Sequence, residues 1–254
     1  IENVAYLLKY DTAYGVSDFD VEVKGDSLVI DDSEIKMIHE ADPTKLPWGD
    51  LDIDIVIEST GVFTKYELAR QHITAGAKRV VISAPAKDES KDETEATILM
   101  GINDEKLSVC EVSSNASCTT NAGSPLMAIL DETIGVEKAL LNTIHGYTAT
   151  QAIVDGPSKK NLRMGRAAAQ NMIPSTTGAA VAVTKALPQL EDKFDGISVR
   201  VPVVVGSLVD ITFISKKDTT KEEVQKILRD ASKEARWEGI FTATDEAIVS
   251  SDII

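Results

Sequence analysis

A cysteine within a run of small polar residues is the part of the chain best suited to chemistry. Ser113–Asn121 is rich in hydroxyl and amide side chains and contains Cys118, and the helical pattern of Pro125–Leu130 follows it directly. We therefore expect a loop that ends at a helix N-terminus, with Cys118 in or just before the first turn. The free N–H groups and positive dipole end of a helix favour a thiolate, which is the nucleophilic form of cysteine.

A nucleophilic cysteine needs a base within reach, and the chain offers 3 histidines. His39 falls in an apolar run and His72 in a charged helical pattern. His145 instead closes the strand-like run Ala139–Ile144. A helix followed by a strand between Cys118 and His145 would return the chain so that thiol and imidazole meet. The residues alone leave a second interpretation open, in which the cysteine is buried and inert and the histidine is hydrogen-bonded at a strand end.

Composition excludes several classes of function. The 254 residues include 26 basic and 41 acidic side chains, which gives a formal charge of −15. Such an acidic surface repels nucleic acid and anionic membranes, so we expect neither as a partner. No apolar run approaches the roughly 20 residues that span a bilayer. The 2 cysteines fit a reducing cytoplasm, and we expect Cys110 to be a small core residue rather than a disulfide partner of Cys118.

The elements before Cys118 indicate a parallel sheet. Strands are expected at 54–59 and 79–83, with a helix from about Lys65 to Ala75 between them, which is the pattern of a βαβ unit. Ligands of such sheets lie beyond the carboxyl ends of the strands. The polar residues there could also be ordinary loop residues. Further elements are expected as a helix at 3–10, a hairpin at 19–30, and strands at 35–38, 96–102 and 107–112.

The pattern changes after Cys118, where we place a domain boundary. We expect a helix at 121–133 and a strand at 136–145, and then a long irregular segment at 147–177, which in a compact domain is usually functional. The remaining expected elements are a helix at 178–187, an antiparallel pair of strands at 197–205 and 207–215, a helix at about 219–235 and a strand at 247–254.

A set of motifs in fixed order resembles one enzyme family. Ser117–Asn121, His145–Thr148 and Arg200–Val203 are similar to segments of phosphorylating glyceraldehyde-3-phosphate dehydrogenases. The similarity covers nearly the whole chain and extends through Glu58–Phe63, Ser83–Pro85, Asp155–Ser158 and Ser175–Ala180. The ordered combination is far more specific than any one of these motifs.

The resemblance implies an α/β plus α+β fold in two domains. Residues 1–117 would form an incomplete Rossmann-type NAD-binding domain with a parallel sheet, and residues 118–254 a catalytic domain with an antiparallel sheet. The glycine-rich turn G-x-G-x-x-G does not occur in the sequence. Family members carry that turn and its strand upstream of these residues, and a closing segment downstream. We therefore interpret the chain as incomplete at both ends, and expect it to bind NAD weakly by itself.

The resemblance also implies a reaction. The family oxidises and phosphorylates D-glyceraldehyde 3-phosphate to 1,3-bisphosphoglycerate in glycolysis and gluconeogenesis, as a cytoplasmic homotetramer. Cys118 would attack the aldehyde and form a thioester, with His145 as its base, and inorganic phosphate would then attack the thioester. NAD is expected as the cofactor rather than NADP, because Gly156 and Pro157 are similar to NAD-preferring members. No metal site is expected.

Both phosphate groups are anions, so their sites need cations and hydroxyls. Arg200 lies in an otherwise apolar strand and calls for an anionic partner, which is either a phosphate or an acidic side chain of the chain itself. The resemblance assigns the substrate phosphate to Thr148, Thr150 and Arg200 with Arg163 close by, the attacking phosphate to Ser117, Thr119, Thr177 and Gly178, and the cofactor to Thr60, Gly61 and Ser83. In place of the Asn-Asp of other family members, the chain has Ala149-Thr150, and it has Ala122 where many carry a second cysteine.

Three alternatives remain at this stage. One is erythrose-4-phosphate dehydrogenase, whose thiol–imidazole site is similar and which a comparison of the two aldehydes would separate. A second is a Cys-His hydrolase or acyltransferase, for which thioester hydrolysis without NAD would be diagnostic. The third is a non-catalytic fragment of either dehydrogenase.

Overall fold

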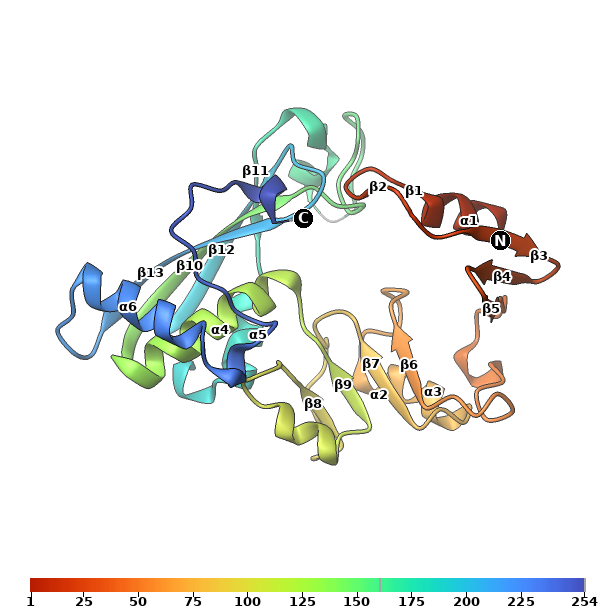
Figure 1. Cartoon of the computed structure of the whole chain (residues 1–254), viewed down its shortest axis with the longest axis horizontal. Helices are drawn as coiled ribbons and strands as arrows, with labels where there is room; N and C mark the ends of the chain where they lie inside the picture. Colours follow the sequence, from red (N-terminus) through yellow and green to blue (C-terminus); the bar gives the residue numbers. More distant parts are fainter. Residues whose placement is uncertain (160, 254) are drawn as a thin grey trace.

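The first half of the chain is built on a parallel sheet. A computed structural model describes residues 1–159 and 161–253. Its strands β6 (Ile55–Glu58), β7 (Arg79–Ile82), β8 (Glu95–Thr97) and β9 (Val112–Ser114) lie in the order β6-β7-β9-β8 with every pairing parallel. This confirms the Rossmann-type expectation (Figure 1).

The crossover between β6 and β7 differs in detail from the prediction. The single helix expected at about 65–75 is two short helices, α2 (Tyr66–Ala69) and α3 (Gln71–Thr74), which meet at Arg70. The guanidinium of Arg70 donates to the carboxylates of Glu95 and Glu111, and this anchoring to neighbouring elements accompanies the break.

The N-terminal segment lies beyond β6, at the edge of the sheet opposite β8 (Figure 1). As expected, it begins with a helix and contains a hairpin. Its elements are α1 (Glu2–Lys9), the pair β1 (Tyr10–Asp11) and β2 (Gly15–Val16), and the antiparallel sheet β3 (Val21–Lys24), β4 (Ser27–Ile30) and β5 (Ser33–Lys36).

The second half is built on a mixed sheet in the order β11-β12-β10-β13, whose strands are β10 (Val136–Gly146), β11 (Ile173–Thr176), β12 (Phe194–Val201) and β13 (Ser207–Ser215). Two of its pairings are antiparallel, and β10 runs parallel to β12. The prediction that 197–205 and 207–215 pair with each other was wrong, because β10 lies between them. The connection from β12 to β13 instead crosses the end of β10, where Gly146 N–H donates to the carbonyl of Gly206.

Three helices cover one face of this sheet: α4 (Cys118–Thr133), α5 (Ala179–Ala186) and α6 (Lys221–Ala231) (Figure 1). Their packing buries Met127, Leu130, Leu141, Val183 and Trp237 in one core. Each such side chain contributes roughly 1.5–3 kcal/mol by leaving water. The core therefore fixes α4 against β10, the two elements expected to carry the chemistry.

Several predicted strands are shorter or absent. The strand expected at 96–102 ends at Thr97, because the Asn103 side chain binds Thr97 O and Leu99 N and turns the backbone. Residues 107–112 form the end of the 3-10 helix η2 (Asp104–Ser108) and the start of β9, and 247–253 contain the 3-10 helix η7 (Ser250–Asp252). Ile254 lies outside the described residues. The other 3-10 helices are η1 (Pro43–Lys45), η3 (Leu162–Gly165), η4 (Ala168–Gln170), η5 (Pro188–Leu190) and η6 (Ala235–Trp237).

The segment expected to be irregular, 147–177, contains η3 and η4 and ends in β11. Within the part of the chain that the structure describes, no helix is both long and apolar enough to cross a membrane.

Candidate active site

Cys118 is the first residue of α4, so it lies in the first turn as expected, although the helix begins earlier than the predicted start at residue 121. The helix begins where Ser117 caps it, since Ser117 Oγ accepts a hydrogen bond from Thr120 N–H at 3.1 Å and lies 2.7 Å from Thr120 Oγ1. Such a cap stabilises a helix by about 1 kcal/mol. Ala116 enters the turn with a φ of 56°, in the left-handed region, so the loop arrives at a fixed angle. The thiol is exposed at the positive end of the helix dipole.

The imidazole of His145 meets this thiol. His145 is near the end of β10, and its Nε2 lies 3.1 Å from Cys118 Sγ. The hydrogen bond to His145 lowers the pKa of Cys118, although burial opposes the shift. The same bond raises the pKa of His145, opposed by burial and by the positive charge of Arg200. The pair is therefore arranged to hold a thiolate, which is the nucleophile.

Arg200 lies on the other side of the imidazole ring. Strand β12 pairs with β10 so that Arg200 stands opposite His145. Its Nη1 is 2.6 Å from His145 Nδ1 and 3.0 Å from the Gly146 carbonyl oxygen. Nδ1 of His145 also lies 2.6 Å from the Gly146 carbonyl oxygen, to which it donates when the ring is protonated. This hydrogen bond also raises the pKa of His145 and favours the imidazolium, whose Nε2–H faces the Cys118 sulfur.

Arg200 has no carboxylate to neutralise it. It is half-buried, and among the described residues no acidic side chain forms an ion pair with it. Burial lowers its pKa, and the charge of Cys118 raises it. The interpretation of Arg200 as half of an internal salt bridge therefore fails, and the guanidinium is left to bind an anion.

A pair of threonine hydroxyls lies just after β10. Thr148 Oγ1 and Thr150 Oγ1 are 2.9 Å apart, within hydrogen-bond distance of each other. Sequence reasoning missed Gln151, which is buried and accepts a hydrogen bond from Thr148 N–H at 3.2 Å. Its Nε2 has no partner among the described residues. A glutamine in an irregular segment gives no local signal of this role.

The hydroxyl of Thr119 is turned inward. It lies 3.5 Å from Thr143 Oγ1 and 3.3 Å from Ser207 Oγ, in a buried hydroxyl cluster between α4 and the sheet. Sequence reasoning missed Thr143 and Ser207, and the only signal was a polar residue within an apolar strand. Besides the hydrogen bond from His145, the backbone N–H and the hydroxyl of Thr119 also contribute to the lowered pKa of Cys118.

The remaining predicted phosphate residues are more dispersed. Thr177 Oγ1 accepts from Ala179 N–H at 3.1 Å and so begins α5, with Gly178 as its exposed N-cap. Arg163 is exposed in η3, which packs beside β11. Within the described part of the chain, none of these three is hydrogen-bonded to Cys118 or His145.

The predicted cofactor residues lie at the carboxyl ends of adjacent parallel strands. Thr60 and Gly61 follow β6, Ser83 follows β7, and all three are exposed. Gly61 has a φ of 75°, and no atom lies within 4 Å of the position that a Cβ would take. Open backbone and free surface at this edge of the sheet fit a dinucleotide.

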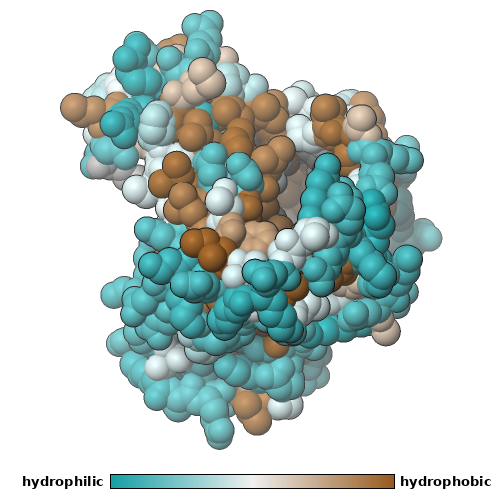
Figure 2. All heavy atoms as spheres, turned by 90° about the vertical axis from the view of Figure 1, so that its left-hand side faces the viewer, coloured by the Kyte–Doolittle hydropathy of each residue, from teal (hydrophilic) through white to brown (hydrophobic). Residues whose placement is uncertain are grey.

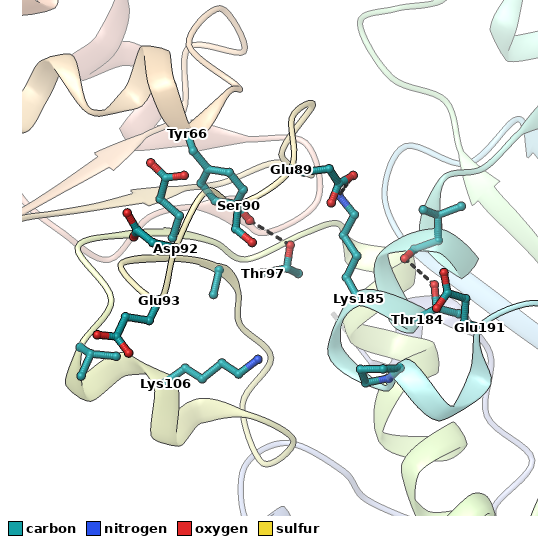
Figure 3. Close-up of a pocket in the computed structure, with 15 residues that line it drawn as sticks. Tyr66, Glu89, Ser90, Asp92, Glu93, Thr97, Lys106, Thr184, Lys185 and Glu191 are labelled. Atoms are coloured by element: carbon teal, nitrogen blue, oxygen red, sulfur yellow. Dashed lines mark hydrogen bonds and ion pairs between the residues drawn. The ribbon is translucent and has the colours of Figure 1, made fainter.

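A separate cavity lies away from these residues. It measures about 760 Å³ and opens between β8 and α5, where the buried Tyr66 bonds Thr97 (Figure 3). Burial raises the pKa of Tyr66 to about 12. Glu89 and Lys185 form an ion pair of 3.1 Å across its mouth. Carboxylates outnumber lysines in its lining, which includes Glu89, Asp92, Glu93, Glu95 and Glu191 with Lys106 and Lys185, so it does not resemble an anion site.

Comparison with known proteins agrees with this geometry. Residues 1–66 match the NAD binding domain of glyceraldehyde 3-phosphate dehydrogenase, and residues 117–254 match the C-terminal domain of that enzyme. The chain is 50% identical to glyceraldehyde-3-phosphate dehydrogenase 1 of Candida glabrata over 251 residues, covering 98% of this chain and 74% of that protein. It is 48% identical to the glyceraldehyde-3-phosphate dehydrogenase of Streptomyces coelicolor, with 98% and 73% covered. The corresponding enzyme of Borreliella burgdorferi is also 48% identical, with 99% and 76% covered. The chain therefore belongs to the glyceraldehyde 3-phosphate dehydrogenase family of NAD-dependent oxidoreductases.

Proposed function

We propose that the chain oxidises and phosphorylates D-glyceraldehyde 3-phosphate to 1,3-bisphosphoglycerate, with Cys118 as nucleophile and His145 as base. The observation that carries the proposal is the alignment of three groups: Cys118 Sγ lies 3.1 Å from Nε2 of His145, and Arg200 lies 2.6 Å from Nδ1 of the same ring. A thiolate, a proton acceptor and an unpaired cation thus meet at one point of the surface. We place the domain boundary at Cys118, where β9 of the parallel sheet gives way to α4.

The first step is attack of the Cys118 thiolate on the aldehyde carbon. The new C–S bond moves the carbonyl electron pair onto oxygen, which takes the Nε2 proton of the His145 imidazolium and forms a hemithioacetal, leaving the imidazole neutral. The N–H of Cys118 at the start of α4 and the Nε2–H of His145 are the donors that can stabilise this oxygen. His145 then removes the hydroxyl proton as the C–H bond breaks and the thioester forms.

Bound NAD⁺ supplies an acceptor for the hydride that leaves the carbon. Thr60, Gly61 and Ser83 are the residues of this chain that would hold it, since they lie at the exposed carboxyl ends of β6 and β7.

Inorganic phosphate completes the reaction. A phosphate oxygen attacks the thioester carbon, the C–S bond breaks, and Cys118 leaves as a thiolate that its contact with His145 stabilises. We assign this phosphate to the first turns of α4 and α5, through Ser117, Thr119, Thr177 and Gly178. We assign the substrate phosphate to Thr148, Thr150 and Arg200, with Arg163 at its rim.

The arginine assignment gives a direct test. Replacing Arg200 by leucine should raise KM for glyceraldehyde 3-phosphate by about 10–100-fold, because hydrogen bonds to charged groups contribute about 1.5–3 kcal/mol. Lysine keeps the charge but loses the two-pronged geometry, so Arg200→Lys should have a smaller effect. Steady-state kinetics measure both. Arg166→Leu removes an exposed arginine paired with Asp155 and serves as the matched control. An unchanged KM in Arg200→Leu would remove Arg200 from the substrate site.

The uncovered face of the mixed sheet supports assembly into a homotetramer. Four residues on that face are apolar and exposed, and Figure 2, seen from the side of this sheet, shows hydrophobic residues gathered there. They are Leu140, Ile197, Leu208 and Ile214. Exposed apolar residues also occur in the segment 147–177, at Ile153, Val154, Leu162 and Met172. Patches of this kind mark protein interfaces, and we propose a second copy of the chain as the partner.

A charged residue on this face should weaken the assembly. We expect Leu208→Asp to shift the chain toward smaller species in sedimentation velocity, because an unpaired carboxylate is costly to bury at an interface. Leu51→Asp, at an exposed apolar position outside the sheet, is the matched control. A Leu208→Asp variant that sediments like the wild type would show that the face is not the contact.

We also place the protein in the cytoplasm. Both cysteines are free thiols, Cys110 buried and Cys118 exposed, and a reducing compartment maintains an exposed catalytic thiol.

A further inference from the structure

Two buried titratable residues of the parallel-sheet domain have no part in the mechanism described above. Glu58, the last residue of β6, is 3% exposed, and His72 in α3 is 5% exposed. A carboxylate and an imidazole at such depth destabilise a fold unless each polar atom is hydrogen-bonded. Their partners therefore indicate what the pair does.

The indole of Trp48 fixes the tautomer of His72. Trp48 Nε1 donates to His72 Nδ1 at 3.0 Å. An indole N–H can only donate, so Nδ1 is an acceptor and the ring proton is on Nε2. That nitrogen lies 3.1 Å from Glu58 Oε2 and donates to it. The hydrogen bonds therefore all donate in one direction, from Trp48 to His72 and from His72 to Glu58.

The other oxygen of Glu58 holds the turn that follows β6. Oε1 accepts hydrogen bonds from the backbone N–H of Thr60 at 2.8 Å and from the Thr60 hydroxyl. Thr60 Oγ1 in turn accepts from Val62 N–H at 3.1 Å. The carbonyl of Glu58 accepts from Ser83 N–H at 3.0 Å and from Ser83 Oγ at 3.2 Å. One residue therefore ties together both strand ends assigned to the cofactor.

We propose that Glu58 is the positioning residue of the dinucleotide-binding turn, oriented by the chain of hydrogen bonds from Trp48 through His72. The Glu58 carboxylate accepts three hydrogen bonds, two from Thr60 and one from His72. Because they hold Thr60 in place, the next residue, Gly61, keeps its left-handed conformation with a φ of 75° and faces open space. Glu58 acts through Thr60 and Gly61 and does not itself touch the cofactor. This inference rests on the proposed function, because it assigns the turn to NAD⁺.

Glu58→Gln tests the role with little change of volume. The amide of Gln has one acceptor oxygen and one donor NH₂ group, whereas both Glu58 oxygens are acceptors. In either orientation the NH₂ group therefore faces another donor, which is either His72 Nε2–H or Thr60 N–H, and one hydrogen bond is lost. We expect the amide proton of Thr60 to lose its downfield shift and slow exchange in NMR spectra. We also expect NAD⁺, titrated against the shifts of Thr60 and Gly61, to bind about tenfold more weakly or worse.

A second variant separates positioning from mere stability. In Trp48→Phe/Glu58→Gln the indole donor is gone, so the His72 proton can move to Nδ1 and Nε2 can accept from the amide of residue 58. The double variant should therefore recover much of the Thr60 signal and of the NAD⁺ response lost in Glu58→Gln. Destabilisation alone predicts the reverse, since removing part of the Trp48 side chain makes an already weakened fold weaker.

The tautomer itself is read in the wild-type chain from the ¹⁵N shifts of the histidine rings, with the exposed His39 as reference. The inference requires a proton on Nε2 of His72. It is overturned if His72 carries its proton on Nδ1, or if Glu58→Gln leaves the amide signal of Thr60 unchanged. It is also overturned if NAD⁺ changes the shifts of Thr60 and Gly61 equally in the wild type and in Glu58→Gln, or changes them in neither protein. Alkylation of Cys118 by iodoacetamide should be equally fast in all variants, so a failure of the catalytic proposal is detected separately.

Discussion

Replacing Cys118 by serine is expected to abolish phosphate-dependent formation of NADH from glyceraldehyde 3-phosphate, with a loss of at least about 10⁴-fold. A serine hydroxyl at this position stays protonated at neutral pH, so the contact with His145 and the helix dipole no longer produce an anionic nucleophile. The measurement is the initial rate of NADH formation at saturating NAD⁺, with and without inorganic phosphate.

Cys110 provides the matched control. Its thiol is buried, and burial raises its pKa, while its sulfur donates to the carbonyl oxygens of Thr94 and Val112. Cys110→Ser should therefore retain the NADH-forming activity, and iodoacetamide should label only Cys118 in the native wild-type chain. Retained activity in Cys118→Ser would refute the covalent mechanism.

Replacing His145 by asparagine is expected to reduce the same rate by about 10²–10⁴-fold, the usual contribution of a positioned general base. It should also change how the reactivity of Cys118 depends on pH. The hydrogen bond from His145 lowers the pKa of the thiol below the 9.0 of a free cysteine, so the wild type keeps a thiolate at pH values where an ordinary thiol is protonated. Without that bond, the pKa of Cys118 should rise.

The rate of alkylation by iodoacetamide, measured as a function of pH, checks the direction of this shift. Between the lowered pKa of Cys118 and 9.0, the wild type should react faster than His145→Asn, and the two rates should converge above 9.0. His39→Asn alters an exposed histidine and should leave the profile unchanged. Coinciding profiles for the wild type and His145→Asn would show that the imidazole does not control the thiol.

Local features of the sequence were sufficient to predict much of the catalytic machinery. The position of Cys118 at the beginning of α4 follows from a polar run that leads into an apolar helical pattern, and β10 follows from an apolar run that ends at His145. The parallel sheet was predictable in the same way, because a strand–helix–strand pattern at this spacing has few alternatives. The ordered motifs then indicated the family, which the matched domains confirm.

Only the tertiary structure decided which strands are neighbours. Periodicity reports which residues of a strand face the core, but pairing depends on contacts between distant segments, so β12 and β13 were wrongly paired with each other instead of with β10. The register of β12 on β10 places Arg200 opposite His145, and no local pattern contains that information.

The same limit applies to the residues that support the site. Thr143 and Ser207 meet Thr119 across 24 and 88 residues of sequence, and Trp48, His72 and Glu58 come from a loop, a helix and a strand. The sequence by itself determined which groups could do the chemistry, because propensity and capping act over a few residues. Folding alone determined their partners and their protonation, because a hydrogen bond between distant residues exists only once the chain has closed the loop between them.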